Sequence, residues 1–82
     1  MLVVFGDKYQ ISDQDVDGAG TSYYGYVNKE GNTYVIMKAI VTLKVTNYTY
    51  VVGTGTYTTS WTGRAALTYV NYAVAWNAAN MI

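Results

Sequence analysis

The chain has 82 residues, with five basic and five acidic side chains and no histidine, cysteine or proline. The missing histidine and cysteine exclude disulfide bonds, zinc fingers, thiol nucleophiles and imidazole acid–base catalysis. A net charge of zero gives no electrostatic attraction for nucleic acid or for an anionic membrane. A chain of this length buries about 60–65% of its unfolded surface, which predicts one small domain that is marginally stable as a monomer.

The amino-acid types favour β-structure. Hydrophobic residues make up 51% of the chain and aromatic residues 16%, and ten of the aromatic residues are tyrosine. Threonine, valine and tyrosine fit the pleated, half-buried surface of a sheet. Because so little charge keeps molecules apart, we expect a homo-oligomer.

The first half of the chain predicts an N-terminal strand or arm followed by a hairpin. Residues 1–11 have the alternation of an extended segment, whereas residues 12–21 are polar and contain glycine, which predicts a loop. Residues 23–28 and 33–38 have strand character. The segment 29–32, Lys-Glu-Gly-Asn, supplies the turn between them.

The middle of the chain predicts two further strands. Residues 40–46 alternate with a period of two, which is typical of a half-buried strand. Asn47 is expected to turn the chain into a strand over residues 48–52. Gly53-Thr54-Gly55 marks another turn.

The last third is ambiguous between helix and strand. Tyr57 and Trp61 are four residues apart and hydroxyl side chains lie between them, which predicts one or two helical turns over 57–65. Residues 67–76 alternate again and predict a strand, with a helix over 65–79 as the alternative because alanine is frequent there. The tail, 77–82, is expected to be flexible or docked on a neighbour.

These elements together predict a mainly β fold in a single domain over residues 1–82. The expected architecture is a small antiparallel sheet or sandwich of four to six short strands, with a short helix near 57–65. The apolar opening, 1–5, is too short for a signal-peptide core, and no stretch approaches the roughly 18 apolar residues of a membrane span. We therefore expect synthesis in the cytoplasm without a cleaved leader, and no membrane or nucleic-acid partner.

The segment Asp13-Gln14-Asp15-Val16-Asp17-Gly18 matches the opening of a calcium-binding loop. In such loops alternate carboxylates converge on one ion and the glycine permits a sharp turn. The loop also needs a glutamate at its twelfth position, which here is Tyr24. Calcium held by Asp13, Asp15 and Asp17 is therefore a weak hypothesis beside a solvated acidic loop, and no other cofactor is expected.

Tyrosines gather in the predicted strands. One interpretation is a carbohydrate-binding platform of aromatic faces, and the favoured one is a protein–protein interface or core, where a ring buries a large area and its hydroxyl stays paired. Arg64, the single arginine, is expected to stack on Trp61 or to pair with an aspartate of the predicted loop. The interface candidates are Tyr23, Tyr24, Tyr26, Tyr34, Tyr48, Tyr50, Trp61 and Arg64.

Catalytic motifs are missing from the sequence. The serines have no histidine to activate them and lie in no Gly-x-Ser-x-Gly elbow. The two Gly-x-Gly pairs are not followed by Gly-Lys-Ser or Gly-Lys-Thr, so they predict turns rather than phosphate loops. We expect no enzymatic activity.

Three sequence blocks carry a resemblance to a known group of proteins. They are Tyr23-Tyr24-Gly25-Tyr26, the block from Glu30 to Lys38, and Tyr57-Thr58-Thr59-Ser60-Trp61-Thr62-Gly63-Arg64-Ala65-Ala66-Leu67-Thr68-Tyr69. They resemble short proteins of tailed bacteriophages, often encoded near virion genes, with the patterns Tyr-Tyr-Gly-Tyr, Gly-Asn-Trp-Tyr-Ile-Met-Lys and Tyr-x-x-x-Trp-x-x-Arg-Ala-x-Leu-x-Tyr. The resemblance covers about residues 20–76, and the last block is its most specific part. Thr33 and Val35 depart from the second pattern.

The resemblance implies a virion-associated protein and brings no catalytic residues with it. We expect a non-enzymatic structural or assembly protein of a phage particle, such as a decoration, tail or fibre-associated subunit. Its partners would be copies of itself or other virion proteins. The alternatives are a carbohydrate- or receptor-binding β module and a self-assembling β fibre, since no proline protects the strand edges.

Overall fold

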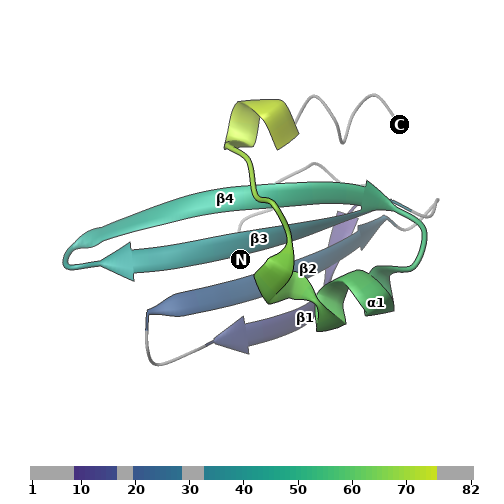
Figure 1. The fold of residues 1–82 in the computed structure, drawn as a ribbon, viewed down its shortest axis with the longest axis horizontal. Coiled ribbons are helices and arrows are strands. Elements are labelled where there is room, and N and C mark those ends of the chain that lie inside the picture. The colour runs from purple at the N-terminus through teal and green to yellow at the C-terminus, as the bar shows by residue number, and fades with distance from the viewer. Residues whose placement is uncertain (1–8, 17–19, 29–32, 76–82) are drawn as a thin grey trace.

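The computed structural model describes residues 9–16, 20–28 and 33–75 (Figure 1). Within them the chain forms one antiparallel sheet whose strands lie side by side in chain order. The predicted mainly β fold, an antiparallel sheet of four to six strands with a short helix near 57–65, is confirmed, with four strands in the described residues. The elements are β1 (Tyr9–Val16), β2 (Thr21–Asn28), β3 (Thr33–Thr42), β4 (Val45–Thr54), α1 (Tyr57–Thr62) and the 3-10 turn η1 (Arg64–Ala66), and residues 72–75 form a further helical turn.

The pairing register decides which side chains share a face of the sheet. Gly25 of β2 pairs with Ile36 of β3, which in turn pairs with Val51 of β4. These residues lie on the face that α1 covers, which we call the helix face (Figure 1). Because side chains alternate along a strand, their neighbours Tyr26 and Val35 belong to the opposite face.

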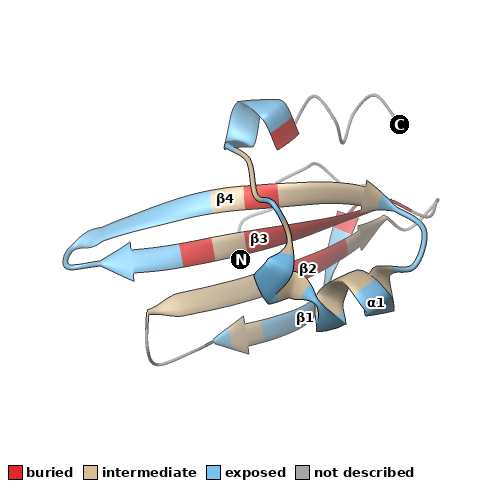
Figure 2. Ribbon diagram, viewed as in Figure 1, coloured by how far each residue is buried: buried red, intermediate tan, exposed pale blue. Residues whose placement is uncertain are grey.

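The buried apolar cluster of the described residues lies on the opposite face. Val35 and Ile36 are adjacent in β3 and belong to opposite faces, yet both have no exposed surface, so both faces of this strand are covered (Figure 2). The buried members of the cluster are Tyr9, Tyr26, Val35, Met37, Tyr50 and Ala75, with Tyr24, Val52 and Val70 packed beside them.

The end of the chain connects the two faces around the edge of β4. Val70 and Tyr50 exchange two backbone hydrogen bonds of 2.7 Å at that edge. Asn71 then begins the helical turn, because its side-chain oxygen accepts a hydrogen bond from the Val74 amide at 3.1 Å. The turn brings Ala75 into the opposite-face cluster. Figure 1 shows the chain leaving η1 and crossing β4 on this path.

The strand β1 extends further along the chain than the sequence predicts, to Val16 instead of residue 11. The expected loop over 12–21 is wrong for its first part, because β1 pairs with β2 as far as Val16, opposite Ser22. The register shifts between Ile11 and Asp13, so the polar segment enters the sheet through an irregularity typical of edge strands. Of the predicted N-terminal arm, residues 1–8 lie outside the described residues, as does the predicted tail, 77–82.

Asn47 does not turn the chain, contrary to the prediction. It pairs with Ile40 inside the β3–β4 ladder, and the turn lies at Leu43 and Lys44 instead. Leu43 adopts a φ of 56°, in the left-handed region that favours glycine. Turn composition could not indicate this position, because neither residue is a common turn former.

The strand predicted over 67–76 is wrong beyond Val70. Only Val70 pairs with the sheet, and residues 72–75 are helical. The alternative helix over 65–79 does not describe the segment either, because residues 67–70 are not helical and separate η1 from the last turn.

Candidate functional site

Glycine allows α1 to lie directly on the sheet. A side-chain carbon added at Gly25 would overlap the hydroxyl of Tyr57 and would come within 3.0 Å of the Trp61 ring. A side chain on Gly53 would overlap the Tyr34 ring in the same way. The sheet surface under these rings is therefore flat because two glycines occupy it.

The rings on the helix face form a connected stack. Tyr34 meets Tyr57 edge to face with 5.9 Å between ring centroids, and Tyr57 stacks on Trp61 at 6.1 Å. The hydroxyls of Tyr34 and Ser60 are 2.6 Å apart, and the Tyr57 hydroxyl donates to Oδ2 of Asp13 at 2.9 Å. Burial, together with the bond to this carboxylate and its charge, raises the pKa of Tyr57.

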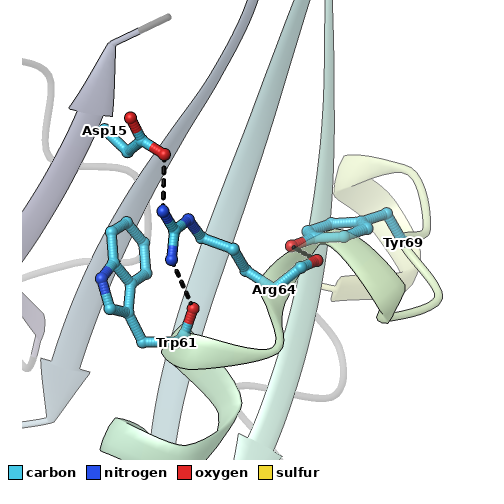
Figure 3. A network of polar contacts seen from close by, with 4 residues as sticks. All are labelled: Asp15, Trp61, Arg64 and Tyr69. Carbon is cyan, nitrogen blue, oxygen red and sulfur yellow. Dashed lines mark hydrogen bonds and ion pairs between the residues drawn. The ribbon is translucent and has the colours of Figure 1, made fainter.

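Arg64 attaches the segment after α1 to the edge strand β1. Its guanidinium carbon lies 4.4 Å from the centroid of the Trp61 ring, and Nη2 contacts Oδ2 of Asp15 at 2.6 Å (Figure 3). Nη1 donates to the Trp61 carbonyl oxygen at 2.8 Å. The side chain of Arg64 is 24% exposed and that of Asp15 is 42% exposed, so water screens this ion pair in part.

Tyr69 completes the same arrangement from the other side. Its hydroxyl donates to the carbonyl oxygen of Arg64 at 2.8 Å, and its ring lies 6.2 Å from that of Tyr23. The ammonium group of Lys38 is 5.3 Å from the Tyr69 centroid. Burial, with Tyr23 nearby, raises the pKa of Tyr69 to about 12. We call Asp15, Tyr23, Trp61, Arg64 and Tyr69 the Arg64 clamp.

The clamp accounts for the most specific sequence block. Tyr57, Trp61, Arg64 and Tyr69 all make contacts that hold the C-terminal segment on the sheet. Both contacts considered for Arg64, stacking on Trp61 and pairing with an aspartate, are present together. The residue pattern in this block is thus a packing pattern, and it brings together no exposed reactive group.

Two of the three aspartates predicted to bind calcium interact instead with side chains of the C-terminal segment. Asp13 accepts from Tyr57 and Asp15 pairs with Arg64, both on the helix face, while Asp17 lies outside the described residues. Over 9–16, 20–28 and 33–75 there is no group of three or more metal-ligating side chains. The described residues therefore give the calcium hypothesis no support.

Most of the predicted interface residues make contacts within the molecule. On the helix face these are Tyr23, Tyr34, Trp61 and Arg64. On the opposite face Tyr26 and Tyr50 are buried and Tyr24 packs against the same cluster. Tyr48, at 51%, is the exposed member of the set.

Tyr26 is the one buried tyrosine whose hydroxyl lacks a hydrogen-bond partner in the described part of the chain. Burial, with Tyr24 and Tyr50 nearby, raises its pKa to about 12. Such an orphaned buried hydroxyl lowers stability.

A group of exposed apolar side chains lies at the end of the β3–β4 hairpin, and sequence reasoning singled out only Tyr48 among them. The last residue of β3 that pairs with β2 is Ile40, and the hairpin continues past it (Figure 2). We call residues 40–48 the hairpin arm. Its exposed apolar side chains are Ile40 (37%), Val41 (51%), Leu43 (95%), Val45 (59%) and Tyr48 (51%). The sequence signal for the arm is a run that is apolar on both faces and carries Lys44 as its one charge.

Comparisons with protein-family models, with curated proteins and with solved structures find no match to this chain. In the described part of the chain, no helix has the length and apolar character needed to cross a membrane.

Proposed function

We propose that this chain is a non-enzymatic structural subunit that assembles with copies of itself or with other virion proteins. The observation that supports the proposal is the hairpin arm. Three of its exposed apolar side chains, those of Val41, Leu43 and Val45, stand beyond Ile40, the last residue of β3 that pairs with β2. The polar side chains that lie close together elsewhere, in the Arg64 clamp, are used to close the fold.

The arm has the physical properties of an assembly surface. Soluble monomers commonly expose single apolar residues, whereas several exposed apolar residues close together are typical of an interaction site. Leu43 is the clearest case, because it is 95% exposed at the tip of a turn that strains its backbone. A net charge of zero adds little repulsion between molecules.

The resemblance to short tailed-phage proteins supports placing this subunit in a phage particle. Decoration, tail and fibre-associated subunits are small parts completed by their neighbours, which suits a thin sheet with an exposed apolar arm. The virion is accordingly the proposed location, and no catalytic step is part of the proposal.

Sedimentation velocity over a concentration series tests the assembly. The variant Leu43→Asp places a charge at the tip of the arm, and Val16→Asp places the same charge on another exposed apolar residue, in β1. We expect Leu43→Asp to abolish the concentration dependence and Val16→Asp to retain it. Equal behaviour of both variants would show that the arm is not the assembly surface.

Quantitative mass spectrometry of purified particles tests the location. Peptides of this chain are expected in virions of the encoding phage, at many copies per particle. A chain that is abundant in infected cells and missing from washed particles would contradict the proposal.

A carbohydrate-binding module is the second candidate, and one observation favours it. Tyr72 is 46% exposed and its ring lies 5.6 Å from that of Tyr50, two residues from the exposed Tyr48. The exposed rings of Tyr48 and Tyr72 are the ones available to stack on a sugar. Titration with bacterial surface oligosaccharides should then show binding that Tyr48→Ala weakens, and binding that survives this change excludes the platform.

A further inference from the structure

The two edges of the sheet are built differently. The β1 edge carries a register shift and two aspartates, features that natural proteins use to prevent strand edges from pairing with other chains. The β4 edge over residues 45–49 has a regular register and no charged residue. It therefore lacks the usual protection.

The hydrogen bonds of Tyr50 show which groups of β4 face outward. Its amide and carbonyl both bond to Val70 across the outer edge, each at 2.7 Å. In an antiparallel ladder such residues alternate with residues that bond inward, so Thr46 and Tyr48 also direct their amide and carbonyl groups outward. No described residue bonds to the backbone of either one.

We propose that residues 45–49 of β4 pair with the same residues of a second copy, antiparallel and about a two-fold axis at Asn47. Thr46 then lies opposite Tyr48 of the second copy, and each of these pairs exchanges two backbone hydrogen bonds. The two sheets become one continuous sheet. This inference rests on the proposed function and specifies the partner and the register.

The charge of the edge favours a second copy over a different partner. Residues 45–63 contain no charged side chain, so two copies bring no unpaired charge into the contact. A two-fold axis makes the interface self-complementary, since every outward donor meets the acceptor of the same strand in the other copy. Because Tyr50 already bonds to Val70, the edge available for pairing stops before Tyr50, which limits the paired segment to residues 45–49.

The size of the contact predicts a concentration-dependent association. Five residues of paired strand span roughly 17 Å, and such a pair alone buries less than the about 800 Å² per partner of a stable interface. In the proposed register the Leu43 turn of one copy lies next to the Tyr50–Val70 pair of the other copy. Tyr72 and Val74 follow Val70 in the chain and are 46% and 52% exposed, so they extend the apolar contact.

Proline at Thr46 tests the edge without disturbing the β3–β4 ladder. Thr46→Pro removes an outward amide, and edge strands tolerate proline on that side. Thr46→Ala is the matched control, because it changes the same side chain and keeps the amide. We expect Thr46→Pro to weaken self-association about ten-fold or more and Thr46→Ala to leave it unchanged, with equal circular dichroism spectra. Equal association of both variants would overturn the edge pairing.

Cysteine cross-linking tests the register, because the chain has no cysteine of its own. The two copies of residue 47 form a pair without hydrogen bonds, with α-carbons about 4.5 Å apart, which a disulfide can bridge. The two copies of residue 46 lie about 7–8 Å apart, too far for one. Oxidation should therefore link Asn47→Cys chains and leave Thr46→Cys chains unlinked.

The outcomes separate this inference from the proposed function. Association that persists without a cross-link at Asn47→Cys overturns the two-fold pairing and leaves assembly through the arm standing. A wild-type chain that remains monomeric at every concentration overturns both.

Discussion

Arg64 performs two tasks that one lysine could not combine. Its planar guanidinium lies over the Trp61 ring and also bonds to Asp15 and to the Trp61 carbonyl. A lysine offers one point charge and no plane to stack. The clamp therefore depends on the shape of the arginine as well as on its charge.

Replacing Arg64 by lysine should lower stability more than removing its charged partner does. We expect Arg64→Lys to reduce the free energy of unfolding by about 1 kcal/mol through lost stacking and the lost carbonyl bond. Asp15→Asn should cost less, because the aspartate is 42% exposed and the pair is screened. Urea unfolding measures both, and a larger loss for Asp15→Asn would contradict this account.

The orphaned hydroxyl of Tyr26 gives a prediction of the opposite sign. Tyr26→Phe removes a buried polar atom that has no partner among the described residues, so stability should stay equal or rise. Tyr57→Phe is the control, because it removes a hydroxyl that bonds to Asp13 and should lose about 0.5–1 kcal/mol. A loss for Tyr26→Phe as large as that for Tyr57→Phe would show that Tyr26 has a partner.

At the scale of elements, the seating of α1 on the sheet depends on Gly25. Gly25→Ala would push Tyr57 and Trp61 away and should destabilise the fold by about 1–3 kcal/mol, with a changed near-UV circular dichroism signal. Gly63→Ala is the matched control, since its nearest contact is an ordinary 3.8 Å. If the two variants unfold at the same urea concentration, the close approach at Gly25 is not what holds α1.

A substitution in the turn of the hairpin arm should affect stability and assembly in opposite directions. Leu43 has a φ of 56°, which glycine adopts freely, so Leu43→Gly should stabilise the monomer by about 1 kcal/mol. The same change removes the most exposed apolar side chain and should weaken self-association. Thermal unfolding of the dilute chain and sedimentation of the concentrated chain measure the two effects. A variant that is both less stable and fully associating contradicts this role of Leu43.

Strands could be predicted where the local hydrophobic pattern determines the structure. They could not be predicted where contacts with distant residues determine it. The hydrophobic alternation and the hairpin around 29–32 located β2 and β3, and the spacing of Tyr57 and Trp61 located α1. The extension of β1 to Val16 depends on partners of its aspartates in α1 and η1, far along the chain. The helical turn at 72–75 depends on Asn71 as its cap, while the apolar alternation there resembles a strand.

The candidate site was likewise predictable only where neighbouring residues in the sequence determine it. Arg64 was found because it is the single arginine and lies near Trp61 in the sequence, but the partner Asp15 is 49 residues away and only the fold brings it near. The hairpin arm was missed because its exposure depends on where β2 begins, at Thr21, which pairs with Ile40 of β3. Sequence alone cannot tell a paired apolar strand from an unpaired one.

At the scale of the whole molecule, the tyrosines make stability sensitive to alkaline pH. Burial raises the pKa of Tyr26 and of Tyr69 to about 12 and also raises those of Tyr50 and Tyr57. An unfolded tyrosine ionises at about pH 10, so between pH 10 and 12 the unfolded chain loses protons that the folded chain keeps. The stabilising contribution is therefore complete below about pH 10 and is lost as the pH rises towards 12.

Urea unfolding at a series of pH values from 8 to about 11.5 measures this loss. We expect the free energy of unfolding to fall steeply above pH 10 and the Tyr26→Phe variant to show a shallower fall. A flat profile over the whole range would mean that the tyrosine hydroxyls are solvated in the folded protein.

We propose for the whole molecule that a small sheet, closed by the Arg64 clamp, presents an apolar arm that other subunits cover. Light scattering of the purified wild-type chain over a concentration series, up to its solubility limit, tests this most directly. The account predicts a molar mass that rises above the 9.0 kDa of the single chain as concentration increases. A mass that stays at 9.0 kDa throughout the series would contradict it.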